Sequence, residues 1–281
     1  MVFMFDLLDV SQLINLVSVM AMAATVSGFM AGLLGVGGGI IMVPALYYAF
    51  TVLGFDASTK MHLSLGTSLA IIIPTSIMST KTHMQYDAVD FKLIKSFGIF
   101  VALGVLLGTL LASNLETKRL LLIFSIFSAC VGIFFIFFRE QIGATPRNIP
   151  TYIKSSIGTF IGFISVPLGI GGGSLSVPFM RMFGYNIRNA IGTSAAIGFL
   201  ISLVGAASMS FSGNFFDTVN SPLSLGYVNL PGFLVFVPVT MIMAPIGARL
   251  VHKIDKNTLS KIFGCFLLLI SARSFYEYLH F

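Results

Sequence analysis

Long apolar runs recur along the whole sequence, and they constrain its fold more than any other feature. Segments such as 11–34, 61–80 and 91–112 reach or approach the length of about 20 residues that a helix needs to cross a bilayer. Only 9% of the 281 residues are charged, whereas a soluble domain carries about 25%. The chain has too few charges to cover a surface that faces water, so we expect an all-α polytopic membrane protein.

Two other apolar segments, 40–53 and 174–185, are too short to cross the membrane. At 1.5 Å per residue such helices are about 20 Å long, against about 30 Å for the hydrocarbon core. Each half of the chain is therefore expected to hold about four long helices and one short leg, which makes eight long spans and ten helical segments. The remaining long segments are expected at 118–138, 152–170, 190–212, 227–250 and 258–279.

Each short segment follows a glycine-rich break, and the two breaks are copies of one motif. Residues 34–46 read LGVGGGIIMVPAL and residues 168–180 read LGIGGGSLSVPFM, identical at seven of thirteen positions. The GTS sequence at 66–68 recurs at 192–194. A third match, in the same order, joins LGTLLASNLETKRLLLIF to PIGARLVHKIDKNTLSKIF further along each half. Three ordered matches predict an internal duplication.

The duplication divides the chain into an N-terminal transmembrane repeat at 1–140 and a C-terminal repeat at 150–281, joined by a linker at 141–149. If each short leg returns toward the side on which its half began, twelve of the sixteen basic residues fall on one side, which is then cytoplasmic. They are Lys81, Lys92, Lys95, Arg139, Arg147, Lys154, Arg181, Arg188, Arg249, Lys253, Lys256 and Lys261. The loop 213–226, without Lys or Arg, falls outside. The halves are then two inverted repeats, an arrangement common in secondary transporters.

The glycine run of each break has four alternative interpretations. A dinucleotide fingerprint needs a soluble βαβ unit, and a potassium-type filter needs a symmetric ring of loops. Helix packing explains pairs such as Gly28 and Gly32, but not three consecutive glycines. We favour a discontinuous helix, in which Pro44 and Pro178 suit the first turn of each short leg. Its free N–H groups and positive dipole end then face a small anion inside the protein.

The predicted binding groups are the main-chain N–H groups of the breaks together with nearby hydroxyls. The candidates are Gly35, Gly37, Gly38, Gly39, Gly169, Gly171, Gly172, Gly173, Ser174, Thr67, Ser68, Thr193 and Ser194. The GTS hydroxyls have two alternatives, donation to an oxyanion or a bond back to carbonyls of their own helix. Ser174 and Ser176 stand where the first copy has Ile40 and Met42, so the second lobe is more polar.

Three further observations bear on mechanism. His62 and Arg188 occupy matching positions at the mouths of two helices, where they are candidates for gating or anion attraction, or interfacial anchors. Arg273 and Glu277, one turn apart, are expected to pair. No Walker motif, metal cluster or buried carboxylate relay is visible, so we expect neither an enzyme nor a cofactor, and proton or Na⁺ coupling stays open. The net charge of +6 lies in short loops and does not indicate nucleic acid.

The doubled pattern GxGGGxxxVP, at Gly35–Pro44 and Gly169–Pro178 and followed each time by GTS, resembles the sulfite exporter TauE/SafE family, also called the 4-toluene sulfonate uptake permease family. The resemblance implies a transporter of sulfur-containing anions, such as sulfite, sulfonates or sulfoacetate, in the cytoplasmic membrane of a prokaryote. It places the family's glycine-rich segments on the glycines named above. We expect a monomeric or homodimeric carrier, in contact with membrane lipids, that works by alternating access. An anion channel with a continuous pore is the alternative.

Overall fold

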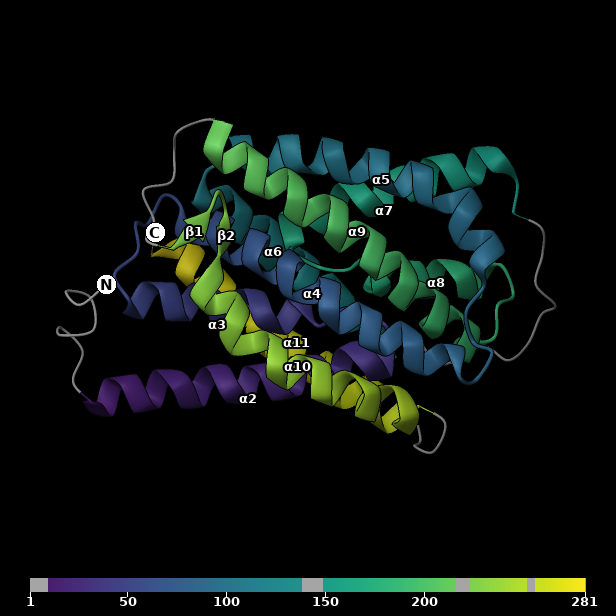
Figure 1. Ribbon diagram of the computed structural model, residues 1–281, viewed down its shortest axis with the longest axis horizontal. Coiled ribbons are helices and arrows are strands. Elements are labelled where there is room, and N and C mark those ends of the chain that lie inside the picture. Colours follow the sequence, from purple (N-terminus) through teal and green to yellow (C-terminus); the bar gives the residue numbers. More distant parts are fainter. Residues whose placement is uncertain (1–9, 138–148, 216–222, 252–255, 281) are drawn as a thin grey trace.

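The computed structural model describes residues 10–137, 149–215, 223–251 and 256–280. These residues form ten helices and one short hairpin, with most helices lying along one axis (Figure 1). The helices are α2 (Val10–Leu34), α3 (Gly39–Val52), α4 (Lys60–Met84), α5 (Phe91–Asn114), α6 (Thr117–Phe137), α7 (Thr151–Leu168), α8 (Gly173–Met182), α9 (Ile187–Phe215), α10 (Leu230–Leu250) and α11 (Lys256–Leu279). All ten expected helical segments are present. The linker predicted at 141–149 lies, except for Ile149, outside the described residues.

Six of the described helices are long and apolar enough to cross a membrane: α2, α4, α5, α6, α9 and α10. The predicted spans α7 and α11 are not among these six. Lys154, several hydroxyl residues and Pro167 lower the apolar character of α7, which is 18 residues long. The fold is thus mainly helical with six candidate spans in the described part of the chain.

A hairpin of β1 (Ser224–Leu225) and β2 (Val228–Asn229) precedes α10 and departs from the all-helical expectation. The helix expected from residue 227 therefore begins at Leu230. The Asn229 side chain fixes this start, because its Oδ1 atom accepts a hydrogen bond from the Gly232 N–H at 2.9 Å. Such an N-cap satisfies one of the free donors of the first turn.

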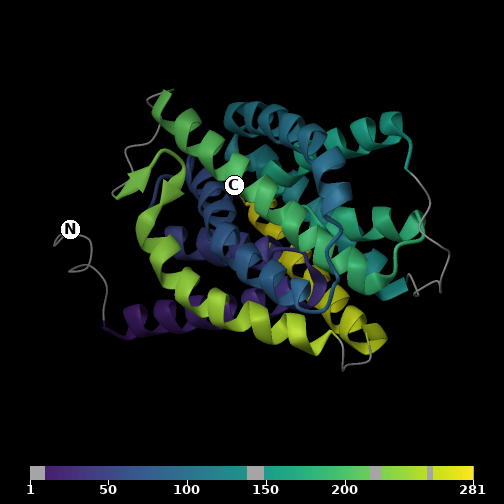
Figure 2. The same ribbon diagram turned by 45° about the vertical axis from the view of Figure 1, so that its right-hand side comes forward.

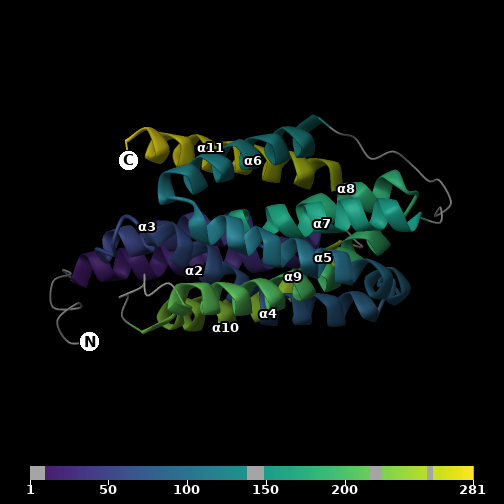
Figure 3. The same ribbon diagram turned by 90° about the horizontal axis from the view of Figure 1, so that it is seen from above.

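The two central helices, α4 and α9, cross in antiparallel directions. Gly205 of α9 faces Leu69 of α4, whereas Gly198, earlier in α9, faces Ser76, later in α4. Of the apolar stretches in these helices, 78% and 72% are buried, against 28% in α10. In the view from above, α6 and α11 run side by side as a separate layer (Figure 3). Their direction is also antiparallel, since Ser271 bonds the Ser125 carbonyl and Gly264 faces Gly132.

The outer helices pair across the two halves of the sequence. Helix α2 packs on α10 along one edge of the molecule (Figure 2), and α5 packs on α7. A Cβ atom at Gly32 would collide with the Ala244 carbonyl of α10, and one at Gly104 with the Thr159 carbonyl of α7. These contacts confirm that the GxxxG pairs serve helix packing, in which small residues let backbones approach.

The two ends of the helical bundle differ in charge. The hairpin and the C-terminus lie at one end, and the loop between α4 and α5 lies at the other with the ends of α8 and α10 (Figure 1). At this second end the Tyr185 hydroxyl bonds Asp90, and Lys154 bonds Ser96. The segments that carry most of the basic residues assigned to the cytoplasm therefore gather at one end.

Candidate functional site

Helices α3 and α8 both begin at a glycine in the left-handed backbone region. The N-cap residues are Gly38, with φ of 77°, and Gly172, with φ of 67°. Residues with a Cβ atom rarely adopt this conformation. The requirement explains glycine at these two positions and ends the preceding segment abruptly, so that a new helix starts inside the protein.

The two breaks touch each other at the centre of the molecule. A Cβ atom at Gly37 would lie 3.2 Å from the Gly171 Cα atom, and these two residues occupy matching positions in the two copies. Around this contact the approach is reciprocal. Gly39 lies against the Gly169 carbonyl, and Gly173 lies against the Gly35 carbonyl, so that any side chain at Gly39 or Gly173 would collide with backbone. The structure therefore brings all eight predicted glycines together.

The serine hydroxyls of the GTS sequences bridge the two breaks. Ser68 donates to the Gly169 carbonyl at 2.8 Å, and Ser194 donates to the Gly35 carbonyl at 3.2 Å. Ser194 also lies 2.8 Å from the Ile191 carbonyl of its own helix. Each serine thus holds the break of the opposite half, a partner that sequence reasoning missed. Only Ser194 makes the local bond that was one of the two expected alternatives.

The threonine hydroxyls of the same sequences hold the starts of two other helices. Thr67 accepts a hydrogen bond from the Asn229 N–H at 2.8 Å, and Thr193 accepts one from the Asp90 N–H at 2.9 Å. Asn229 and Asp90 are the N-caps of α10 and α5. Sequence reasoning missed these two residues, although an Asn or Asp directly before an apolar run is a recognised helix-start signal.

Both breaks contain buried N–H groups without a protein partner. Residues 37–40 and 171–174 are buried. The first hydrogen bonds of the two short helices start only at Ile41 and Leu175, and the structure describes no acceptor for the four preceding N–H groups in either break. Buried backbone donors are nearly always paired. Eight backbone donors for which no acceptor is described thus lie at two touching helix N-termini, the kind of position at which anions bind in other proteins.

The second break adds two hydroxyls to these donors. Ser174 and Ser176 are 3% and 0% exposed, and neither hydroxyl has a hydrogen-bond partner among the described residues. The first break has Ile40 and Met42 at the matching positions, both buried and apolar. The second break therefore carries two buried hydroxyls that are available for further hydrogen bonds, and the first break carries none at the matching positions.

His62 and Arg188 have different surroundings despite their matching positions. His62 is buried, its Nε2 atom lies 2.9 Å from the Leu115 carbonyl oxygen, and its ring stacks on Tyr227. Arg188, in the first turn of α9, is exposed. A gating role for either residue stays a prediction.

Electrostatic contacts at the basic end hold the start of α5. The Tyr185 hydroxyl donates to the Asp90 Oδ2 atom at 3.0 Å, while Asp90 Oδ1 caps the Leu93 N–H. Burial, together with the neighbouring Asp90 carboxylate, raises the pKa of Tyr185 to about 12. The tyrosine stays protonated at physiological pH and keeps its hydrogen bond.

Comparison with known proteins places this arrangement in a family. The sulfite exporter TauE/SafE family matches residues 20–274, a range that includes both breaks and both GTS sequences. The chain belongs to the sulfite exporter TauE/SafE family. It is accordingly a membrane transporter, and the resemblance seen in the doubled glycine motif is confirmed.

Several relatives of this TauE/SafE chain match over almost their whole length. A probable membrane transporter protein of Haemophilus influenzae is 30% identical over 254 residues, covering 90% of this chain and 96% of that protein. The probable membrane transporter protein YunE of Bacillus subtilis is 28% identical, covering 92% of this chain and 97% of its own. A similar protein of Methanocaldococcus jannaschii is 24% identical. No solved structure matches the chain.

Proposed function

We propose that this protein is a secondary transporter that moves a small sulfur-containing anion, such as sulfite, a sulfonate or sulfoacetate, across the cytoplasmic membrane of a prokaryote. The observation that carries the proposal is the set of buried, unpaired N–H groups in residues 37–40 and 171–174. Membership of a sulfite exporter family supports the sulfur anion as the substrate. The same membership supports transport rather than catalysis.

The chemistry of the breaks suits a compact oxyanion. A sulfite or sulfonate group presents three oxygens, each able to accept hydrogen bonds from backbone N–H groups. Hydrogen bonds to a charged acceptor are shorter and stronger than neutral ones. The positive dipole ends of α3 and α8 add to the attraction without a charged side chain. The anion is then held largely by main chain, with the Ser174 hydroxyl as an additional donor.

Reciprocal contacts support two inverted repeats, at 1–140 and 150–281, joined by the cytoplasmic linker 141–149. Ser68 and Ser194 each donate a hydrogen bond to a carbonyl in the break of the other half. Thr67 and Thr193 each accept one from the N-cap residue of a helix in the other half. Helix pairing repeats the exchange, with α2 on α10 and α7 on α5. The matching helices α4 and α9 are antiparallel, which suits a two-fold axis in the membrane plane. Eight long spans, including α7 and α11, complete this topology.

The same arrangement supports a mechanism of alternating access. Each break starts inside the protein and each short leg runs toward a different end of the bundle, so an anion between the breaks has one leg on either side of it. A carrier of this kind opens one side at a time, whereas a channel keeps a continuous pore.

Counterflow in liposomes tests the proposal. The purified protein is reconstituted into vesicles preloaded with unlabelled sulfite, and uptake of external labelled sulfite is followed, with methanesulfonate and sulfoacetate as competing anions. A carrier gives transient accumulation that saturates with substrate concentration. A flux that dissipates without accumulation and without saturation would support the channel instead, and no flux of any of these anions would overturn the proposed substrate class.

A further inference from the structure

Two short segments with matching backbone geometry lie at opposite ends of the bundle (Figure 1). Residues 87–90 read DAVD and precede α5, and residues 226–229 read GYVN and precede α10. Each begins with a residue in the left-handed backbone region, Asp87 with φ of 51° and Gly226 with φ of 54°. Each ends with the N-cap residue of the helix that follows. We call residues 87–90 the inner strap and residues 226–229 the outer strap, after the sides on which the proposed topology places them.

The second residue of each strap is bonded to one of the two central helices. The Ala88 N–H donates to the His83 carbonyl of α4 at 3.2 Å. The Tyr227 N–H donates to the Met209 carbonyl of α9 at 3.3 Å. Because α4 and α9 are the matching helices of the two halves, the two straps are attached to the molecule in the same way.

Each strap also lies on the GTS sequence of the opposite half. The Ala88 carbonyl is so close to Gly192 that a Cβ atom there would collide with it, and the Tyr227 carbonyl is equally close to Gly66. Two residues later, the N–H of the N-cap residue donates to the threonine of the same GTS sequence. The glycine of GTS therefore makes room for the strap, and the threonine holds it.

In each GTS sequence, adjacent residues hold a strap and a break. Thr67 accepts a hydrogen bond from the outer strap at 2.8 Å, and Ser68 donates one to the second break at 2.8 Å. Thr193 and Ser194 make the same two contacts with the inner strap and the first break. Neighbouring residues of a rigid helix move together. A shift of one GTS sequence therefore acts on a strap and on a break at the same time.

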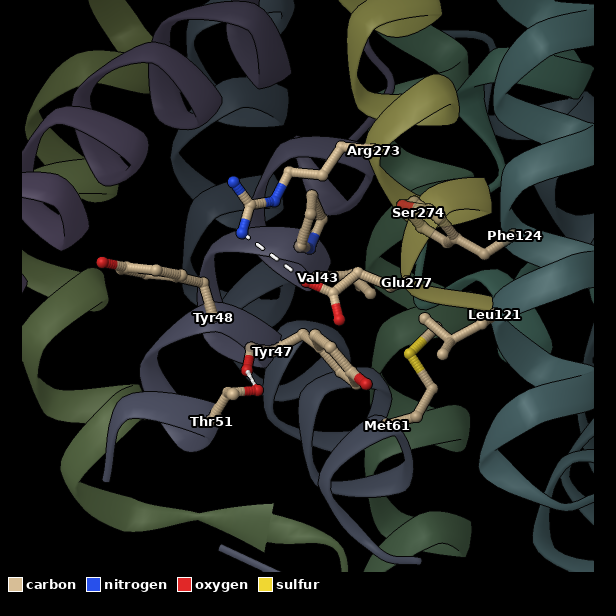
Figure 4. A pocket seen from close by; sticks show the side chains of 11 residues that line it. Val43, Tyr47, Tyr48, Thr51, Met61, Leu121, Phe124, Arg273, Ser274 and Glu277 are labelled. Carbon is tan, nitrogen blue, oxygen red and sulfur yellow. Dashed lines mark hydrogen bonds and ion pairs between the residues drawn. The ribbon is translucent and has the colours of Figure 1, made fainter. Parts of the chain in front are cut away.

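The breaks are closed off from solvent at both ends of the bundle. The threonines and serines of both GTS sequences are 0% exposed, and residues 37–40 and 171–174 are buried. The pocket beside α3 and α11, which Tyr47 and Arg273 help to line (Figure 4), has none of the break glycines or GTS residues among the described residues of its wall. An anion therefore reaches the breaks only after a segment at one end has moved.

We propose that the two straps are the gates of the transporter, and that each GTS sequence couples one gate to one break. Thr67 and Thr193 are positioning residues that hold the outer and the inner gate closed. Release of a strap frees its GTS sequence to shift, and the neighbouring serine passes that shift to the break carbonyl that it holds. The proposal rests on the proposed function and adds to it the parts that open and close.

Cysteine labelling measures the opening of each strap in the absence of any substrate. The full-length protein, with Cys130 and Cys265 replaced by Ala, is purified and treated with N-ethylmaleimide. A88C reports on the inner strap and V228C on the outer strap. Both positions are buried, with exposed fractions of 1% and 5%, so the labelling rate follows the fraction of time that each strap is open.

Substitution of the GTS threonines is expected to release one strap at a time. Thr67→Val removes the hydroxyl at almost constant volume and should raise the labelling rate of V228C about tenfold, the usual effect of losing one hydrogen bond and leaving its buried partner unpaired. It should not raise the rate of A88C. Thr193→Val should give the reverse result.

Matched variants separate a gate from a general structural role. Thr67→Ser and Thr193→Ser keep the hydroxyl and are expected to restore the wild-type labelling rates. A valine variant that raises labelling equally at both straps, or at neither, would overturn the proposal. Tyr185→Phe, which removes a hydrogen bond to Asp90 of the inner strap, is a second variant expected to raise labelling of A88C alone. Elution as a single peak in size-exclusion chromatography confirms that each variant has folded.

Counterflow with the same variants connects the gates to transport. Exchange requires that each gate is able to close, so the two valine variants are expected to lose most of the counterflow that the serine variants retain. Undiminished counterflow in both valine variants would also overturn the gating role. An absence of flux in the wild type would instead overturn the proposed substrate class, and the labelling rates, measured without an anion, would still show whether the straps open separately.

Discussion

At the residue scale, the serines around the breaks divide into two groups. Ser68 and Ser194 each donate to a backbone carbonyl of the opposite half, so their hydroxyls are engaged in holding the structure. Ser174 and Ser176 are equally buried, but their hydroxyls have no hydrogen-bond partner in the described part of the chain. A buried polar group without a partner costs stability. A ligand bound at the breaks, as proposed above, would complete these hydrogen bonds and remove that cost.

Replacing Ser174 with alanine should weaken anion binding and spare the fold. Loss of one hydrogen bond to a charged ligand lowers affinity about tenfold or more, while removal of an unpaired hydroxyl leaves stability unchanged or slightly higher. Binding of sulfite to the purified protein, measured by calorimetry, checks the affinity. Ser202→Ala is the control, because this buried hydroxyl bonds the Phe199 carbonyl of its own helix. Equal affinities in the Ser174 variant and the wild type would remove Ser174 from the site.

Replacing Tyr185 with phenylalanine should destabilise the protein, and the difference should disappear at high pH. Unfolded tyrosine loses its proton near pH 10, but Tyr185 in the folded protein keeps it to about pH 12. The stabilisation is therefore complete below pH 10 and is lost as the pH rises toward 12. Thermal unfolding in detergent at pH 8 and pH 11 measures this, with exposed Tyr152→Phe as the control. A difference between Tyr185→Phe and wild type that is independent of pH would contradict the assignment.

The sequence predicted which residues gather at the site, but not their partners. Glycines that allow a break, and hydroxyls one turn into the next helix, are visible as a repeated motif. The Thr67 and Thr193 contacts, in contrast, join residues 162 and 103 positions apart. Contacts between residues so far apart in the sequence depend on how the helices pack. For the same reason the local sequence around Tyr47 did not indicate that Arg273 of α11 would line the same pocket.

At the scale of elements, hydropathy located the helices well. The segment expected at 11–34 is α2, Val10–Leu34, and the short segment expected at 40–53 is α3, Gly39–Val52. The predicted helix boundary was less accurate where a polar side chain caps the helix. Helix α10 starts three residues late because Asn229 caps it after a hairpin. Apolar faces resemble one another, so the exchange of helix partners between the halves was not predictable from hydropathy.

Replacing Gly32 with alanine should separate α2 from α10. The added methyl group would collide with the Ala244 carbonyl, and overpacking of this kind costs about 1–3 kcal/mol. Gly205→Ala in α9 is the control, because its methyl group would meet only side-chain ends of Leu69 and Val105. That variant is expected to be as stable as the wild type or up to about 1 kcal/mol more stable, since alanine favours a helix. Thermal unfolding of both variants and the wild type in the same detergent measures these differences. A Gly32→Ala variant as stable as the wild type would contradict the close contact between α2 and α10.

At the scale of the whole molecule, the arrangement of charges and the reciprocal contacts both support the proposed topology. The loops rich in lysine and arginine gather at one end of the bundle, and the opposite end carries the hairpin and the C-terminus (Figure 1). The four remaining basic residues, Lys60, Lys118, Arg119 and Arg273, lie outside those loops.

Cysteine labelling should place the two ends on opposite sides of the membrane. In the variant without native cysteines, L225C in the hairpin is expected to react with an impermeant maleimide in intact cells. K92C, exposed at the start of α5, is expected to react only after the cells are permeabilised. The reason is the positive-inside rule applied to the inverted halves. Reaction of both residues in intact cells would contradict the proposed orientation.

The pairing of α2 with α10 has a consequence for biosynthesis. Helix α2 is made first, yet the groove that receives Gly28 and Gly32 belongs to a helix near the end of the chain. Helix α5 likewise packs on α7, which is synthesised later. The first half therefore leaves the ribosome with its small-residue faces turned toward lipid, and its packing is completed only after most of the second half has been inserted.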